Sequence, residues 1–93
     1  MDNMDKKALA IVRYWIKRNI PGPLPDYNEY IVWKAKILQN YKYMIWADLD
    51  DHYYEVTYNG LYQEWYLDAY KKEKNQKFMD ITVEAEILRK VEI

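Results

Sequence analysis

The stretch from Tyr53 to Tyr70 constrains the fold of this chain more than any other feature. Two segments rich in aromatic residues flank the dipeptide Asn59-Gly60. Asn-Gly between alternating segments is the strongest short-range pattern for a β-hairpin, because both central residues of a type I′ turn need positive φ. The sequence therefore predicts a hairpin with strands over 52–58 and 61–70, joined by a two-residue turn.

A two-residue turn also fixes the register of the hairpin. One face, with Tyr54 opposite Trp65, is the more apolar and is expected to meet a helix. The opposite face pairs Thr57 with Tyr62, Glu55 with Glu64, and Tyr53 with Tyr66. Like charges directly opposite each other are unfavourable on a sheet, so two facing glutamates indicate full solvation or a partner that supplies Lys or Arg. Exposed tyrosines are typical of protein interfaces. We therefore predict a partner-binding face formed by Tyr53, Glu55, Tyr62, Glu64 and Tyr66.

The remaining segments predict one α+β domain over 1–93. An amphipathic helix is expected over 3–19, because apolar residues recur there at helical spacing. A proline-rich spacer over 20–26 ends it, since proline lacks the amide donor. Alternation from residue 30 predicts two further strands, so that the sheet spans 30–70. The expected fold is an N-terminal amphipathic helix packed on an antiparallel four- or five-stranded meander sheet.

The C-terminal part of the chain is expected to contain a loop and one further element of secondary structure. A polar loop is expected over 71–77. The tail over 79–93 alternates through Ile81, Val83, Ala85 and Ile87, which predicts a fifth strand. A short C-terminal helix is the alternative, because Ala, Glu, Leu, Arg and Lys are good helix formers.

Composition excludes several classes of protein. There are no cysteines, which removes disulfides, thiolate nucleophiles and Cys-based metal sites. The 14 basic and 15 acidic residues nearly cancel, so no global field attracts nucleic acid or an anionic membrane. No apolar run approaches the roughly 20 residues needed to span a bilayer. We expect a cytoplasmic protein without a membrane contact, either a monomer or a homodimer.

Three clusters of charged residues invite a chemical interpretation. His52 follows Asp48, Asp50 and Asp51, but their spacing lacks the order of a metal loop, which favours a solvated acidic turn. Glu55, Glu64 and Asp68 could be interpreted as the paired carboxylates of a glycosidase, yet a small sheet offers little burial to raise the pKa of one of them. We therefore predict no catalytic residues, no metal and no cofactor.

Lysines form the third cluster. Lys71, Lys72, Lys74 and Lys77 follow Tyr70, and lysines beside aromatic rings are typical of single-strand binding surfaces. The acidic residues of the adjoining strands would repel a phosphate backbone, so a solvated loop is the favoured interpretation. The pattern leaves open which face of the sheet Lys34 and Lys36 occupy, because a one-residue slip inverts the face.

Several of these motifs resemble a known family. The segments YYEVTYNG (53–60) and EWYLDAYKK (64–72), with Val32-Trp33 and Leu38-Gln39-Asn40, are similar to small uncharacterised proteins encoded by phages and prophages of Gram-positive bacteria. The resemblance covers about residues 30–72. It implies a phage protein acting in the cytoplasm of a bacterial host, and it assigns no catalytic or binding residues.

Two functions follow as expectations. The first is a non-catalytic phage-type protein that engages and inhibits a bacterial host or defence protein through the tyrosine-rich acidic face, as anti-CRISPR proteins do. The alternative is a module that binds single-stranded nucleic acid or nucleotides with the same rings and with Lys34, Lys36, Lys71 and Lys72. An enzyme is the least favoured interpretation, because no nucleophile motif or phosphate loop is present.

Overall fold

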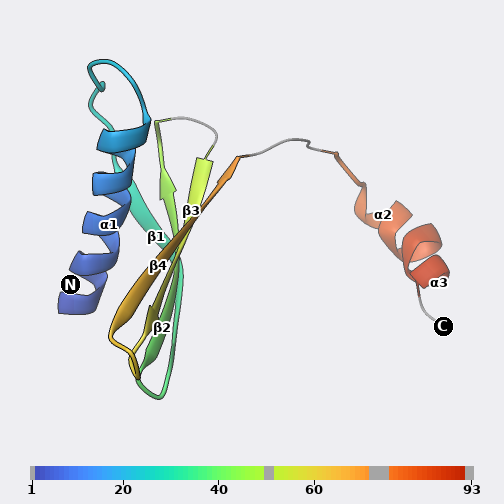
Figure 1. Ribbon diagram of the computed structural model, residues 1–93. Coiled ribbons are helices and arrows are strands. Elements are labelled where there is room, and N and C mark those ends of the chain that lie inside the picture. Colours follow the sequence, from blue (N-terminus) through green and yellow to red (C-terminus); the bar gives the residue numbers. More distant parts are fainter. Residues whose placement is uncertain (1, 50–51, 72–75, 92–93) are drawn as a thin grey trace.

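The computed structural model describes residues 2–49, 52–71 and 76–91. An N-terminal helix, α1 (Asn3–Asn19), crosses one face of an open antiparallel sheet (Figure 1). The sheet contains β1 (Glu29–Ile37), β2 (Asn40–Ala47), β3 (His52–Asn59) and β4 (Glu64–Lys71), in the order β1-β2-β3-β4. The α+β meander expected from the sequence is therefore confirmed, with four strands in the sheet.

Helix α1 has the bounds that its sequence predicts. The side chain of Asp2 accepts a hydrogen bond from the backbone N–H of Asp5 at 2.8 Å, which caps the first turn. Ala8, Val12 and Ile16 recur at helical spacing and are fully buried. The helix ends at Asn19, and residues 21–28, which include most of the predicted spacer, contain no helix or strand.

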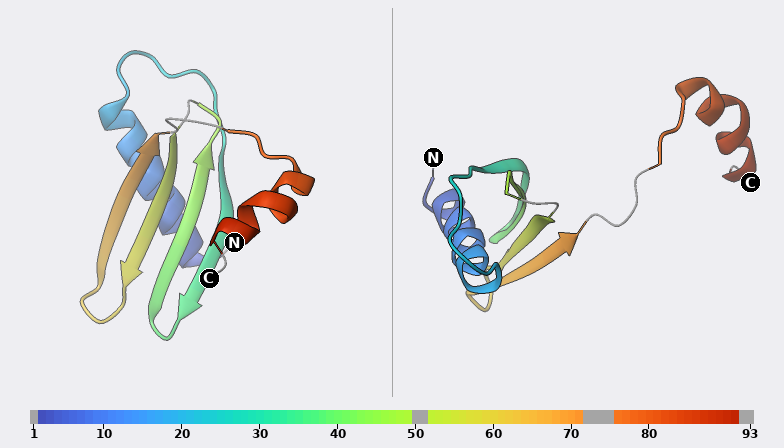
Figure 2. Two further views of the ribbon diagram at one scale, coloured as in Figure 1. Left: turned by 90° about the vertical axis from the view of Figure 1, so that its right-hand side faces the viewer. Right: turned by 90° about the horizontal axis from the view of Figure 1, so that it is seen from above.

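The core lies between α1 and the two central strands. The buried residues of the sheet are Tyr43, Ile45 and Ala47 of β2 and Tyr54 and Val56 of β3. Trp65 and Leu67 of β4 pack at the margin of this cluster. The more apolar face of the predicted hairpin therefore does meet the helix. Figure 2 shows that α1 covers this face and leaves the opposite face of the sheet uncovered by it.

A charged cluster joins the start of α1 to the first two strands. The carboxylate of Asp5, which is itself buried, accepts hydrogen bonds from the Tyr43 hydroxyl at 2.8 Å and from the Lys34 ammonium at 3.0 Å. Each buried polar group of the cluster thereby obtains a partner. The cluster also places Lys34 on the helix side of β1. Lys36, two residues further along the strand, lies on the same side, and its ammonium lies over the Tyr41 ring.

The same cluster predicts a loss of stability at alkaline pH. Burial, followed by the hydrogen bond to Asp5, raises the pKa of Tyr43 above its ordinary value of 10.0. The hydrogen bond to Asp5 likewise raises the pKa of Lys34 above 10.5. The unfolded chain releases these protons at a lower pH than the folded chain does. The contribution of the cluster to the free energy of unfolding is therefore fully present below about pH 10 and is lost as the pH rises above that value. Tyr43 alone accounts for a fall in the free energy of unfolding of up to about 1.4 kcal/mol per pH unit.

Denaturant titrations from neutral pH to about pH 11 measure this effect. The Tyr43→Phe variant should show a shallower fall in the free energy of unfolding above pH 10. Tyr14→Phe, which changes an exposed tyrosine of α1, should retain the wild-type slope. Equal slopes in all three proteins would contradict the assignment to Tyr43.

The turn between β1 and β2 stores strain at Leu38. Ile37 pairs with Asn40, so Leu38 and Gln39 alone form the turn, and Leu38 has a φ of 57°. A side chain in this left-handed region costs about 1–2 kcal/mol, and Leu38 is exposed, so its side chain recovers little by packing.

Replacing Leu38 with glycine is therefore expected to raise the free energy of unfolding by about 0.5–1 kcal/mol, after the entropic cost of glycine. Chemical denaturation measures the change. Replacing Ile37, an exposed neighbour with no positive φ, with glycine should instead destabilise the protein. A loss of stability in Leu38→Gly would show that the turn is not strained.

The hairpin of β3 and β4 exists, but its predicted register is wrong. Tyr58 pairs with Trp65 and Asn59 with Glu64, so four residues, 60–63, connect the strands. The positive φ lies at Gln63 rather than at Asn59-Gly60. The Asn59 side chain accepts a hydrogen bond from the backbone N–H of Leu61 at 3.1 Å, which starts a longer turn in place of a type I′ turn.

The C-terminal segment is helical, so the predicted fifth strand is wrong and the alternative is confirmed for its described part. It comprises α2 (Asp80–Thr82), the π-helical η1 (Val83–Ile87) and α3 (Leu88–Val91), which follow one another directly. Helix-forming Glu, Ala, Leu, Arg and Lys side chains dominate here over the alternation of apolar residues. Of the predicted polar loop, Lys71 belongs to β4 and residues 72–75 lie outside the described residues.

Candidate functional site

The candidate site is the face of the sheet that points away from α1, here called the outer face. Cross-strand partners share a face, so the residues that alternate with the buried core define it. Strands β3 and β4 contribute an acidic half: Tyr53, Glu55, Glu64, Tyr66, Asp68 and Tyr70. Strands β1 and β2 contribute an apolar half: Tyr30, Trp33, Ala35, Ile37, Met44 and Trp46. Lys42 of β2 and Thr57 of β3 lie between the two halves.

Four of the five predicted binding residues lie on the acidic half. Tyr53 and Glu55 come from β3, and Glu64 and Tyr66 come from β4. The fifth, Tyr62, does not pair with Thr57 as predicted, because it lies in the connection between the strands. Its side chain is exposed, beyond the end of the sheet.

The predicted pairing of Glu55 with Glu64 is wrong, but two carboxylates still face each other. Glu55 lies opposite Asp68, and Glu64 lies opposite Asn59. The ammonium of Lys42 lies 2.6 Å from a Glu55 carboxylate oxygen, and this hydrogen bond raises the pKa of Lys42. Lys42 thereby offsets part of the repulsion between Glu55 and Asp68.

Negative charge is in excess on the acidic half. It holds three carboxylates and no basic residue of its own, and Lys42 forms an ion pair with Glu55 alone among them. Glu64 and Asp68 are exposed. The negative charges of Glu55 and Asp68 raise the pKa of Tyr70, which reports their field at its hydroxyl.

The tyrosines of the acidic half are held by specific contacts. The Tyr53 and Tyr70 rings stack with centroids 5.3 Å apart and an interplanar angle of 21°. The Tyr66 hydroxyl donates a hydrogen bond to Glu64, and this bond raises the pKa of Tyr66. Such fixed rings present contact area at a small cost in conformational entropy.

The sequence prediction missed Asp68, Tyr70 and Lys42 as members of this face. Asp68 and Tyr70 continue the alternation of Glu64 and Tyr66, so extending the strand pattern by four residues would have included them. Lys42 could not be placed from the sequence, because its face depends on the register of the first hairpin.

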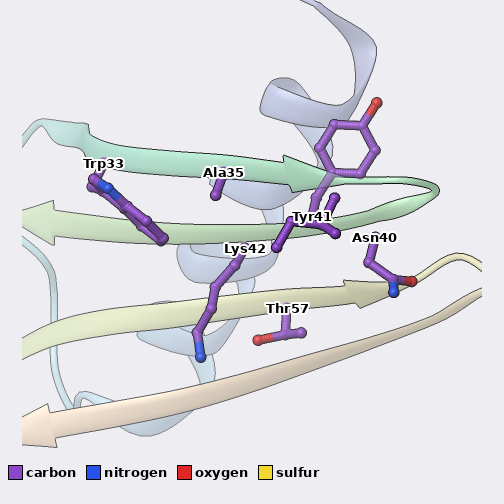
Figure 3. Close-up of a pocket in the computed structure, with 7 residues that line it drawn as sticks. Trp33, Ala35, Asn40, Tyr41, Lys42 and Thr57 are labelled. Carbon is purple, nitrogen blue, oxygen red and sulfur yellow. The ribbon is translucent and has the colours of Figure 1, made fainter.

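The apolar half carries a shallow groove (Figure 3). Its volume is about 270 Å³, just below the range of about 300–1,000 Å³ usual for ligand pockets. A β-bulge between Ile31 and Trp33 turns the Trp33 side chain onto this face. The groove is lined by Trp33, Ala35, Ile37, Asn40, Tyr41, Lys42 and Thr57.

Among the described residues, no group of three or more His, Asp or Glu side chains is arranged to hold a metal ion. His52 starts β3 and its ring lies 6.2 Å from that of Trp15 on the helix side, while Asp50 and Asp51 of the predicted acidic turn lie outside the described residues. None of the described helices is long and apolar enough to cross a bilayer.

Comparison with known proteins identifies a family. The family described as "Family of unknown function (DUF6275)" matches residues 5–80, which include all but the first residues of α1 and all four strands. No curated protein and no solved structure matches this chain.

Proposed function

This chain belongs to the DUF6275 family of unknown function, and from that premise we propose that it is a small non-catalytic protein that binds a bacterial protein through the acidic half of the outer face. One observation carries the proposal: three carboxylates and three tyrosine rings share one exposed half of a sheet, and Lys42 forms an ion pair with only one of the carboxylates. Stability alone gives no reason for such an excess of like charge.

The chemistry of the acidic half indicates the kind of partner surface it fits. Lys and Arg side chains form ion pairs with carboxylates and also stack on tyrosine rings. Tyr66 and Tyr70 offer exposed rings beside Glu64 and Asp68, so a basic patch can meet both at once. If the partner acts on nucleic acid, these carboxylates would occupy positions that normally hold phosphates.

The resemblance to phage and prophage proteins suggests the setting. A phage protein of this kind would act in the cytoplasm of the bacterial host and inhibit a host or defence protein, as anti-CRISPR proteins do. The small size and the compact face of fixed rings suit inhibition by occupation of a functional surface.

Affinity purification from a bacterial host lysate tests the proposal. The Glu64→Lys and Tyr66→Ala variants should each recover at least tenfold less of the partner than the wild-type chain, since each removes a central contact (about 1.4 kcal/mol or more). Asp26→Lys and Tyr14→Ala make the same kinds of change at exposed sites off the outer face and should recover wild-type amounts. Unchanged recovery by both outer-face variants would remove this surface from consideration.

Single-stranded nucleic acid is the alternative ligand, and the distribution of lysines argues against it. Lys34 and Lys36 lie on the helix side of β1, and Lys71 has the alternation of the helix-facing residues of β4. Lys42 is the one lysine of the described outer face, and it is paired with Glu55. A titration with a single-stranded oligonucleotide at low salt should therefore show no binding. Tight binding that weakens steeply with salt would favour this alternative.

A further inference from the structure

Strand β4 forms one edge of the sheet. The strand order β1-β2-β3-β4 gives it a single hydrogen-bonded neighbour among the described residues. The left-hand view of Figure 2 shows β4, drawn in orange, at one side of the sheet. In an antiparallel pair, every second residue directs its backbone N–H and C=O away from the neighbouring strand. Half of the eight residues of β4 therefore offer backbone groups that β3 does not pair.

The two edges of the sheet differ in their protection against further pairing. Natural sheets blunt an edge with β-bulges, prolines and lysines. Strand β1 has a bulge between Ile31 and Trp33, and it carries Lys34 and Lys36. Strand β4 pairs with β3 through eight consecutive residues without a shift of register, it contains no proline, and its one lysine, Lys71, is its last residue. The edge of β4 is therefore the one that is open to a further strand.

The side chains of β4 indicate the chemistry of that strand. On the outer face, Glu64 and Asp68 are exposed, and neither forms an ion pair with a described residue. On the helix side, Trp65 and Leu67 are only partly buried at the margin of the core. A neighbouring strand lies roughly 4.8 Å away and places its side chains opposite these. We infer that β4 accepts an extended segment of the partner as a fifth strand, with Lys or Arg opposite the carboxylates and apolar residues toward α1.

This mode of binding rests on the proposed function, since it describes how the partner docks beside the acidic half. Glu64 and Asp68 are four residues apart on one face of the strand. The partner segment therefore carries its two basic residues four apart as well. Tyr66 lies between the two carboxylates, where its ring can contact the basic side chains. Backbone hydrogen bonds supply affinity in such strand addition, and the alternate side chains supply specificity.

Charge argues against a second copy of this chain at the same edge. Pairing β4 with β4 of another copy brings Glu64 and Asp68 of both copies onto one continuous face, beside Glu55 of each. Like charges on neighbouring strands are unfavourable, whereas a basic segment offsets the excess that a second copy doubles. The described part of the C-terminal segment is helical, so it does not supply this strand.

Hydrogen exchange measured by NMR on the full chain tests strand addition. The probe is the peptide TVKVTVKVT, whose lysines lie four apart on one face of a strand and whose valines lie on the other. Bound peptide should slow exchange at every second backbone amide of β4 at least about tenfold and leave the amides of β1 unchanged. Unchanged exchange throughout β4 at millimolar peptide would overturn the proposal.

Matched peptides separate backbone pairing from charge attraction. A peptide with N-methyl groups on its three central residues keeps both lysines but loses the central N–H donors, so it should bind at least about tenfold more weakly. The acidic peptide TVEVTVEVT should not bind. Asp68→Lys in the protein should weaken binding of TVKVTVKVT at least about tenfold, whereas Asp26→Lys, an exposed site off the outer face, should not. Equal affinity for the methylated peptide would reject strand addition.

The failure of strand addition differs from the failure of the proposed function. If Glu64→Lys and Tyr66→Ala reduce recovery of the partner from a lysate while the peptide leaves β4 exchange unchanged, the acidic half binds through side chains alone and strand addition is wrong. If exchange at β4 slows in the free chain as its concentration rises, a second copy occupies the edge, and the proposal is equally overturned.

Discussion

Replacing Ile45 with alanine is expected to lower the free energy of unfolding by about 3–4 kcal/mol, one of the two largest effects we anticipate. Ile45 lies in the central strand β2 and is fully buried in the cluster between the sheet and α1. Truncation removes apolar contact and leaves a cavity that α1 and β3 can only partly close. For a domain of this size, that loss is a large fraction of the total stability.

The same chain provides a matched control for this change. Ile37 is also an isoleucine in a strand of the first hairpin, but it lies on the outer face and is largely exposed. Ile37→Ala should change the free energy of unfolding by less than about 0.5 kcal/mol. Similar losses in the two variants, measured by urea denaturation, would contradict the placement of the core on the α1 side of the sheet.

Replacing Gly60 with alanine is expected to cost about 2–3 kcal/mol. A Cβ atom at this position would lie 2.2 Å from the backbone oxygen of Gln39 and 2.4 Å from its Cγ. The oxygen belongs to the two-residue turn between β1 and β2, so it cannot move without disturbing that hairpin. The backbone N–H of Gly60 also donates a hydrogen bond to the Asn40 side chain at 2.9 Å, which holds the two hairpin turns together.

Thermal and chemical denaturation of Gly60→Ala measure this cost. Leu61→Ala alters the adjacent, exposed residue of the same connection and should be nearly neutral. A neutral Gly60→Ala would show that the two turns do not approach each other closely.

Gly60 also explains why the sequence mispredicted the hairpin. The Asn-Gly pattern predicts a tight turn in which both residues have positive φ. In the structure, glycine is required at this position because the backbone of Gln39, which is distant in the sequence, lies too close to leave room for a Cβ atom. The resulting register differs from the predicted one by four residues on β4. Because side chains alternate with a period of two, an even shift leaves unchanged the face assignment of each residue that remains in the strands. Trp65 was therefore correctly predicted to face the helix, although its cross-strand partner is Tyr58 and not Tyr54.

Other features could be predicted where they are determined by residues nearby in the sequence. The bounds of α1 followed from a cap, helical periodicity and a proline, all within a few residues of the helix ends. The face of Lys34 and Lys36 depends on a β-bulge at Val32, which no local pattern announces. Four of the six residues of the acidic half could be predicted, because their face needs only the alternation of two strands. The apolar half could not, since Trp33 reaches it through the bulge.

The proposed recognition surface can be tested most directly by site-specific photocrosslinking. A photoreactive residue in place of Tyr66 on the acidic half, or in place of Tyr14 on the exposed side of α1, is activated in a bacterial host lysate. We predict that a partner protein is captured from position 66 and is absent from position 14. Capture of a partner from position 14, with none from position 66, would contradict recognition through the acidic half.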